Sequence, residues 1–370
     1  MNLYAKLLRP LLFCCDPETS HHLTIEACRL AGAIPGLPAA ARRRLTFADP
    51  RLATNVAGLD VANPIGLAAG WDKSGRALAM LGALGFGFAE IGSVSAEPSR
   101  GNPKPRLFRM PQDRAIVVNY GLSNDGAEIV AGRLRAARRP DVPIGVNIVK
   151  TNRGPGSADD SEEAILDDYL RSIQQLRGRA DYLTLNLSCP NVQGGQDYFA
   201  EPKHIGRLLA HLAPLAIERP VFLKIAPHAE EAFLDALLEE VDAFGFVRGF
   251  VFNLPSGKPP WLKLSTPREV WQHWPGAVAG RPVAAMINGC IRTLYNRMPK
   301  GRYSIIGAGG VFSAEDAYEK IRLGASLVQL YTALVYLGPG VVKRINAGLC
   351  RLLERDGFRH IGEAVGRGAA

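Results

Sequence analysis

The chain has 370 residues, of which 47% are hydrophobic and 21% are charged. These proportions are typical of a globular enzyme and exclude a disordered, fibrous or multi-span membrane protein. The formal net charge of +9 favours anionic substrates, phosphate-bearing cofactors or acidic lipid headgroups. The basic residues form short groups such as Arg42-Arg43-Arg44 without interleaved aromatic residues, so we expect no nucleic-acid partner.

The six cysteines show no CxxC pair and no Cys/His spacing typical of a metal site. We therefore expect no metal and a location in the reducing cytoplasm. No apolar run approaches the ~18 to 20 residues of a spanning helix, and no signal-peptide cleavage pattern follows the start. The sequence thus predicts a chain that is neither secreted nor membrane-spanning.

The first forty residues predict two short amphipathic helices. Apolar residues recur at helical spacing from Leu3 to Leu12, and a second helical pattern follows Asp16 and ends near Gly32. Pro35, Gly36 and Pro38 then indicate a linker. Two such helices either cap the end of a barrel or lie on a membrane surface and admit a lipid-soluble ligand, and the pattern leaves both interpretations open.

From Asn63 onward, short apolar runs alternate with longer amphipathic stretches. This alternation predicts parallel strands joined by helices, and eight strands favour an α/β fold of the (β/α)8 TIM-barrel type, with the N-terminal helices as a small extension. The predicted strands are Pro64–Ala69, Phe86–Ser93, Ile144–Val149, Tyr182–Leu187, Val221–Ile225, Gly249–Asn253, Ser304–Gly307 and Leu327–Tyr331.

Unusual residue types follow these strands, at the barrel end where catalytic residues lie. A glycine-rich stretch, residues 307–310, follows the seventh strand, and Tyr331-Thr332 follow the eighth. Backbone amides leading into a helix bind a phosphate group, so we expect a phosphate here. Lys224 lies among apolar residues, where a charge is costly unless an anionic or electron-accepting group meets it; a flavin ring satisfies this requirement.

Cys189 lies between two asparagines in the loop after the fourth strand, with no histidine within several residues. A buried cysteine is often a small hydrophobic residue. A thiol at this end of a barrel can also act as a general base if a nearby cation lowers its pKa. We favour the second interpretation because of the position of Cys189.

Together these segments resemble the dihydroorotate dehydrogenase family over nearly the whole chain. The matching stretches are DPETSHH, NPIGLAAGWDK, GFGFAEIGSVS, GNPKPRLFR, NLSCPN, FLKIAP, IIGAGG and GASLVQLYTALVYLGP. The N-terminal helices, GNPKPRLFR and LYTAL resemble the membrane-associated, quinone-using class. The resemblance implies an FMN-dependent oxidoreductase of pyrimidine biosynthesis that converts dihydroorotate to orotate, with hydride transfer to flavin N5 and quinone as the electron acceptor.

The resemblance also assigns site residues. Cys189 is the expected base, and Arg109 is expected near the quinone tunnel. The substrate-binding residues are expected to be Lys73, Gly121, Asn186, Asn191 and Asn253. The residues expected to bind FMN are Ala69, Gly70, Ser93, Asn147, Lys224, Gly280, Gly309, Gly310, Tyr331 and Thr332.

The resemblance further implies an extension, residues 1–40, that associates with the membrane or caps the quinone tunnel, and a barrel, residues 41–370. The expected location is peripheral, on the cytoplasmic side of the membrane, and otherwise cytoplasmic.

Several positions depart from the family pattern. Quinone-using members typically carry serine where this chain has Cys189. The family's substrate-binding asparagine is Val118 here, its pocket phenylalanine is Leu122, and a serine is Ala279. The family's Thr-Asn-Thr is replaced by Phe-Asn-Leu at residues 252–254. Two alternatives therefore stay open: an FMN oxidoreductase of the same fold acting on a less polar unsaturated or cyclic substrate, and a flavin-binding paralogue without catalysis.

Overall fold

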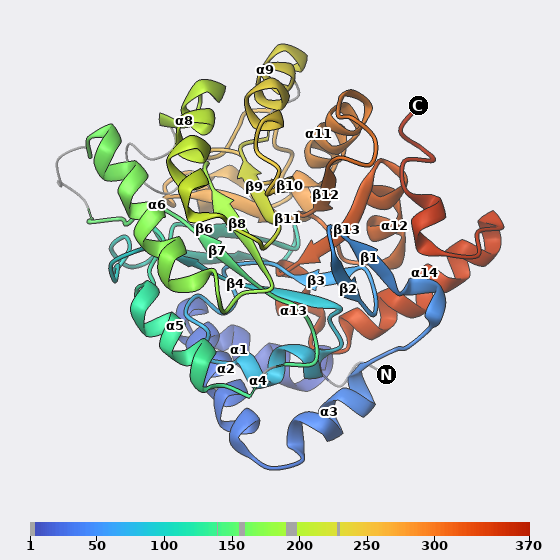
Figure 1. Cartoon of the computed structure of the whole chain (residues 1–370). Helices are drawn as coiled ribbons and strands as arrows, with labels where there is room; N and C mark the ends of the chain where they lie inside the picture. Colours follow the sequence, from blue (N-terminus) through green and yellow to red (C-terminus); the bar gives the residue numbers. More distant parts are fainter. Residues whose placement is uncertain (1–3, 139, 155–159, 190–197, 228–229) are drawn as a thin grey trace.

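The computed structural model describes residues 4–138, 140–154, 160–189, 198–227 and 230–370. Eight parallel strands form a closed barrel (Figure 1), in the spatial order β10-β12-β13-β3-β4-β7-β8-β9. The strands are β3 (Ile65–Leu67), β4 (Phe88–Val94), β7 (Ile144–Ile148), β8 (Tyr182–Asn186), β9 (Val221–Ile225), β10 (Val247–Phe252), β12 (Ser304–Gly307) and β13 (Ala325–Leu330). The predicted (β/α)8 barrel is confirmed, and each predicted strand overlaps one of these eight.

Helices connect the strands and cover the outside of the barrel (Figure 1). Every residue of β7 and β8 is buried, which is typical of parallel strands packed on both faces. The helices of the barrel region are α4 (Leu78–Leu81), α5 (Ala127–Ala136), α6 (Glu162–Leu176), α8 (Pro202–Leu212), α9 (Glu231–Asp242), α10 (Arg268–Trp271), α11 (Ala284–Arg297), α12 (Ala314–Arg322), α13 (Thr332–Leu337) and α14 (Val341–Asp356).

A two-stranded hairpin closes the amino-terminal end of the barrel. It consists of β1 (Thr54–Val56) and β2 (Leu59–Val61), which pair antiparallel. Val56, Leu59 and Val61 form a separate hydrophobic cluster with side chains from six barrel strands, namely Phe88, Tyr182, Phe222, Val251, Ile306 and Leu327. This end of the barrel is therefore filled, and the opposite end is left for a ligand.

A three-stranded antiparallel sheet lies beside the carboxyl ends of the barrel strands. It consists of β5 (Leu107–Met110), β6 (Ala115–Val118) and β11 (Ala277–Gly280), in the order β11-β6-β5. Side chains alternate along a strand, so Ile116 and Val118 share one face, and Ala279 lies directly opposite Ile116. The sequence patterns did not predict this sheet.

The N-terminal extension contains α1 (Arg9–Cys14), α2 (Pro17–Ala33) and α3 (Leu37–Leu45), which lie below the barrel in Figure 1. The Asp16 side chain caps α2 by accepting a hydrogen bond from the Thr19 amide at 2.8 Å. The predicted linker is shorter than expected: Pro35 and Gly36 lie in the turn between α2 and α3, but Pro38 lies in the first turn of α3. Proline is favoured there since the first amides of a helix have no partner within the helix.

A buried ion pair attaches this extension to the barrel. Arg106 Nη2 lies 2.7 Å from Glu18 Oε1 in α2, and both side chains are less than 10% exposed. Arg106 also donates to the carbonyl oxygens of Arg100 and Asn102 at 2.7 and 2.9 Å. Burial would raise the pKa of Glu18, but Arg106 outweighs this effect and the pKa lies below its ordinary value. The pair thus fixes α2 against the segment that precedes β5.

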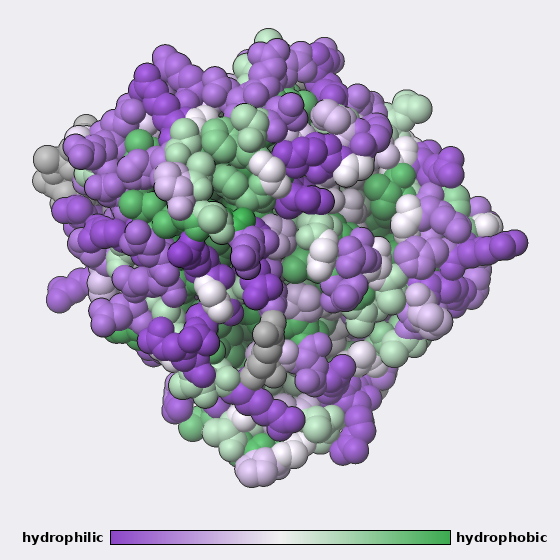
Figure 2. Space-filling model, viewed as in Figure 1, coloured by the Kyte–Doolittle hydropathy of each residue, from purple (hydrophilic) through white to green (hydrophobic). Residues whose placement is uncertain are grey.

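The outer surface of the extension is unusually apolar. The face drawn in Figure 2 is mostly hydrophilic, with hydrophobic residues in smaller groups. Among the described residues, however, seven of the ten exposed large hydrophobic side chains belong to the first 37 residues: Leu7, Leu8, Leu11, Leu23, Leu30, Ile34 and Leu37. No helix in the described part of the chain is long and apolar enough to cross a membrane.

Candidate active site

A cavity opens where the barrel strands end. Of the seventeen site residues expected from the sequence, fourteen line this cavity: Ala69, Gly70, Lys73, Ser93, Gly121, Asn186, Cys189, Lys224, Asn253, Gly280, Gly309, Gly310, Tyr331 and Thr332. These residues come from the ends of β3, β4, β8, β9, β10, β12 and β13, and from segments between them. The fold therefore brings together residues that are far apart in the sequence.

The remaining three assigned residues lie elsewhere. Asn147 is completely buried and does not line the cavity, but its side chain accepts a hydrogen bond from the Ser93 hydroxyl. Arg109 lines a second cavity, described below. Asn191 lies outside the described residues.

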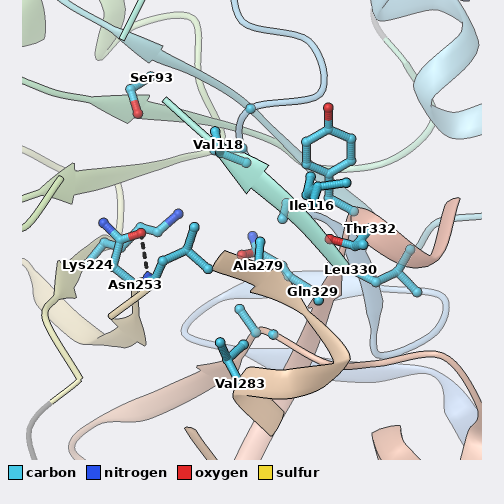
Figure 3. A pocket seen from close by; sticks show the side chains of 18 of the residues that line it. Ser93, Ile116, Val118, Lys224, Asn253, Ala279, Val283, Gln329, Leu330 and Thr332 are labelled. Atoms are coloured by element: carbon cyan, nitrogen blue, oxygen red, sulfur yellow. Dashed lines mark hydrogen bonds between the residues drawn. The ribbon is translucent and has the colours of Figure 1, made fainter. Parts of the chain in front are cut away.

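Amide side chains form one wall of the cavity. Asn186 Nδ2 donates to Ser93 Oγ at 3.1 Å, and Asn253 Nδ2 donates to Asn186 Oδ1 at 3.0 Å. Asn253 Nδ2 also contacts the Ser188 carbonyl oxygen at 3.1 Å. Figure 3 shows Lys224 next to Asn253 on this side. Since each amide is held by its neighbour, the wall presents fixed hydrogen-bonding groups to a ligand.

The opposite wall is apolar. Ile116, Val118 and Ala279 from the three-stranded sheet line the cavity (Figure 3), as the alternation along β6 requires. Leu122 and Leu254 line it as well. The positions named above at which this chain departs from the family pattern therefore all line the ligand cavity: Val118, Leu122, Cys189, Phe252, Leu254 and Ala279.

Lys73 is held at the cavity by the loop after β3. The Asp72 carboxylate organises this loop, because it accepts hydrogen bonds from the Arg76 and Ala77 amides at 2.9 and 2.8 Å. Lys73 Nζ lies 3.7 Å from the centre of the Tyr120 ring and 3.3 Å from His21 Nε2. Burial lowers the pKa of Lys73 to about 7, since removing an ammonium group from water disfavours its charged form.

Cys189 follows β8 and lines the same cavity as Lys224. The Tyr169 hydroxyl donates to the Asn186 carbonyl oxygen at 2.6 Å, and Ser188 Oγ donates to the Lys224 carbonyl oxygen at 3.2 Å. The backbone just before Cys189 is therefore fixed from two sides. This arrangement places the Cys189 thiol in the cavity that Asn186 and Asn253 also line.

A second cavity lies between the N-terminal helices and the barrel. Its walls are mostly apolar, from Leu8, Leu12 and Ala27 on the helices to Leu107 and Leu334 on the barrel side. Arg109 donates to the Cys15 carbonyl oxygen at 3.0 Å, and its guanidinium lies 4.5 Å from the centre of the Phe13 ring. Arg109 thus fixes the connection between α1 and α2 at this cavity.

The two cavities share Ile116 and Tyr331 as lining residues. The Tyr331 hydroxyl lies 3.0 Å from His21 Nδ1. Burial and the neighbouring Lys73 lower the pKa of His21 well below 6.5, so the imidazole is neutral near pH 7. The sequence analysis did not assign His21 to the site, although its DPETSHH motif was part of the family resemblance.

Comparison with known proteins identifies the family. The family model described as dihydroorotate dehydrogenase matches residues 51–353. The chain belongs to the dihydroorotate dehydrogenase family. Relatives named dihydroorotate dehydrogenase (quinone) include one from Deinococcus deserti, 38% identical over 99% of this chain and all of that protein. Another, from Acidithiobacillus ferrooxidans, is 40% identical over 97% of this chain and 98% of that protein.

A solved structure supports this assignment. The dihydroorotate dehydrogenase of Eimeria tenella, crystallised in complex with ferulenol, is 29% identical and covers 95% of each chain with a TM-score of 0.79. The protein is accordingly an oxidoreductase of the dihydroorotate dehydrogenase family, which is flavin-dependent. The fold, the enzyme class and the family expected from the sequence are confirmed.

Proposed function

We propose that this protein oxidises dihydroorotate to orotate, using FMN as its cofactor and a quinone as its electron acceptor. The observation that carries the proposal is the placement of two cavities on either side of Ile116 and Tyr331. One contains Cys189, Lys73 and fixed amides, and the other is large and apolar. This arrangement suits an enzyme that oxidises a small polar substrate and passes electrons to a lipid-soluble molecule.

The residues present fit FMN. Gly309 and Gly310 have φ values of +81° and +75°, and a Cβ at Gly310 would lie 2.4 Å from that of Ala284, in the first turn of α11. The loop therefore runs against the start of a helix, where backbone amides favour a phosphate group. Lys224 would supply a hydrogen-bond donor to the flavin ring. When bound, FMN accepts a hydride from the substrate.

The protein's own residues would then perform three tasks. Lys73 and the amides of Asn186 and Asn253 would bind and orient the substrate. Cys189, as a thiolate, would remove the proton that accompanies hydride loss. Asn147 would position Ser93 by accepting the hydrogen bond from its hydroxyl group. Over the whole cycle, one hydride and one proton leave the substrate, and the quinone gains two electrons and two protons.

The second cavity fits a quinone. Its apolar walls accept an isoprenoid tail, while Arg109, His21 and Tyr331 provide polar groups. The exposed leucines of the extension would contact lipid, because amphipathic helices with such a face bind membrane surfaces. We accordingly propose residues 1–40 as a membrane-associating cap on the quinone tunnel, ahead of the barrel, and a peripheral location on the cytoplasmic side of the membrane. The direct test is quinone-dependent formation of orotate by the purified protein.

A second candidate substrate class is favoured by the apolar wall. Val118, Leu122, Leu254 and Ala279 offer no side-chain hydrogen bonds, and each bond lost to a charged substrate costs about 1.5–3 kcal/mol. A less polar unsaturated or cyclic substrate would bind this wall better. Flavin reduction by such a compound, without reduction by dihydroorotate, would establish this alternative; no reduction by either class would favour a paralogue without catalysis.

The pKa of Lys73 predicts a pH dependence of substrate binding. The ammonium group attracts an anionic substrate, and it is lost as the pH rises through about 7. We expect KM for dihydroorotate to rise on the alkaline side of this value, while the Lys73→Gln variant shows a high KM that changes little with pH. Steady-state kinetics between pH 6 and about 9 would check this. A KM independent of pH in the parent enzyme would contradict it.

Filling the apolar cavity should separate the two half-reactions. Ala27→Trp places an indole in the cavity, so we expect a higher KM for quinone and unchanged flavin reduction by dihydroorotate. Ala33→Trp is the matched control, because Ala33 lies in α2 but does not line the cavity. Equal quinone kinetics in the two variants would show that quinone enters elsewhere.

A further inference from the structure

A carboxylate is buried in the barrel interior next to the cofactor cavity. The Glu90 side chain is completely buried and accepts three hydrogen bonds. Asn147 Nδ2 donates at 2.9 Å, Thr184 Oγ1 at 2.9 Å and Gln329 Nε2 at 3.1 Å. We call these four residues the Glu90 cluster. Each of these three neighbours therefore points a donor toward Glu90.

The hydrogen bond from Nε2 to Glu90 sets the orientation of the Gln329 amide. The Nε2 group of its amide faces Glu90, so Oε1 points away from the carboxylate. Gln329 lines the cofactor cavity (Figure 3), and its Oε1 is buried without a hydrogen-bond partner in the part of the chain that the structure describes. A buried carbonyl oxygen without a partner is destabilising. Gln329 is completely buried, so a group bound in the adjoining cavity has to reach Oε1 in order to supply the missing donor.

Asn147 provides an internal comparison within the cluster. It also donates to Glu90, but its Oδ1 accepts a hydrogen bond from Ser93. Both polar groups of Asn147 are thus used by the protein, and Asn147 does not line the cavity. Of the two amides that Glu90 orients, Gln329 is the one with an acceptor left for a ligand.

We propose that Gln329 is a cofactor-binding residue, whose Oε1 accepts a hydrogen bond from an N–H or O–H group of the bound flavin nucleotide, and that Glu90 is the positioning residue that holds it in this orientation. The inference rests on the proposed use of FMN. A flavin nucleotide carries both kinds of donor, the ring N3–H and the ribityl hydroxyl groups.

The test replaces Gln329 with methionine, which has a similar length and no amide. We expect the Kd for FMN to be about five- to twentyfold higher in this variant than in the parent protein. The Kd is measured from the flavin fluorescence that recovers as FMN dissociates from the diluted holoenzyme. Ser172→Ala is the matched control, because Ser172 also has a buried side-chain oxygen without a partner among the described residues but does not line the cavity. Its Kd should not change.

Two further measurements test the position of the contact and the role of Glu90. If the donor is the ring N3–H, FMN methylated at N3 should bind the parent protein more weakly than FMN does. The Gln329→Met variant should bind the methylated and the unmethylated FMN equally well. A ribityl donor predicts that methylation leaves the difference between the two proteins intact. Glu90→Gln should also raise the Kd, and the loss in the double variant should be smaller than the product of the two single losses.

The proposal is overturned if Gln329→Met binds FMN as tightly as the parent. It is also overturned if the increase in Kd in the double variant equals the product of the increases in Gln329→Met and Glu90→Gln. Thermal unfolding of the apoproteins shows whether each variant folds; if Gln329→Met does not, the same comparison is made with Gln329→Leu. A parent protein that binds no flavin would instead contradict the proposed function, so the two failures are distinguishable.

Discussion

Replacing Cys189 with alanine is expected to lower kcat for dihydroorotate oxidation by about 10²–10⁴-fold, the usual contribution of a general base. FMN should stay bound, because the phosphate loop at Gly309 and Gly310 and the Lys224 side chain come from other parts of the cavity wall. Stopped-flow flavin reduction measures the affected step directly. A variant that reduces its flavin at the parent rate would show that another group removes the proton.

Serine at the same position gives a finer test of the base. An unperturbed thiol has a pKa of about 8.5, and a serine hydroxyl has a far higher one. In the pH–rate profile, the rate rises with pH as the base loses its proton. We expect this rise to occur at higher pH in Cys189→Ser than in the parent enzyme. Superimposable profiles would refute the assignment of this rise to Cys189.

Removing Glu18 is expected to lower the free energy of unfolding by about 3–5 kcal/mol, because it leaves the Arg106 guanidinium buried without its carboxylate. Both side chains are less than 10% exposed in the parent, so water cannot easily replace the lost partner. Urea unfolding of Glu18→Ala measures the effect. Quinone-dependent turnover should fall further than flavin reduction, because α2 forms one side of the apolar cavity.

The matched control lies on the same helix. Glu26 pairs with Arg29 at 2.5 Å on the exposed surface of α2, and exposed pairs contribute little to stability. Glu26→Ala should therefore unfold nearly as the parent does. Similar losses in the two variants would mean that the Glu18–Arg106 pair has no special role in attaching the extension.

The barrel could be predicted from the sequence because its strands are short apolar runs between amphipathic helices, and eight such runs favour a closed barrel. The antiparallel sheet was missed because its strands have only four residues each. Their pairing also joins β6 to β11, which starts more than 150 residues later. Pro38 was assigned to a linker although it lies in the helix Leu37–Leu45, because proline is common both in linkers and at helix starts.

The candidate site was predicted largely from motifs at strand ends, and fourteen of its residues line one cavity. Sequence could not show that Asn147 supports Ser93 from behind, or that Glu90 orients Gln329, because both depend on side-chain contacts between different strands. Glu90 and Gln329 lie within the GFGFAEIGSVS and GASLVQLYTALVYLGP stretches, but nothing in those stretches separates a ligand contact from a structural one.

The proposed function requires that the protein oxidises dihydroorotate by means of FMN bound in this cavity. The most direct measurement is anaerobic mixing of the purified, FMN-loaded protein with dihydroorotate in the absence of quinone. We expect that the flavin absorbance is bleached, that orotate forms in an amount equal to the flavin, and that added quinone restores the oxidised spectrum. A flavin that stays oxidised with dihydroorotate, but is bleached by a less polar cyclic compound, would contradict it.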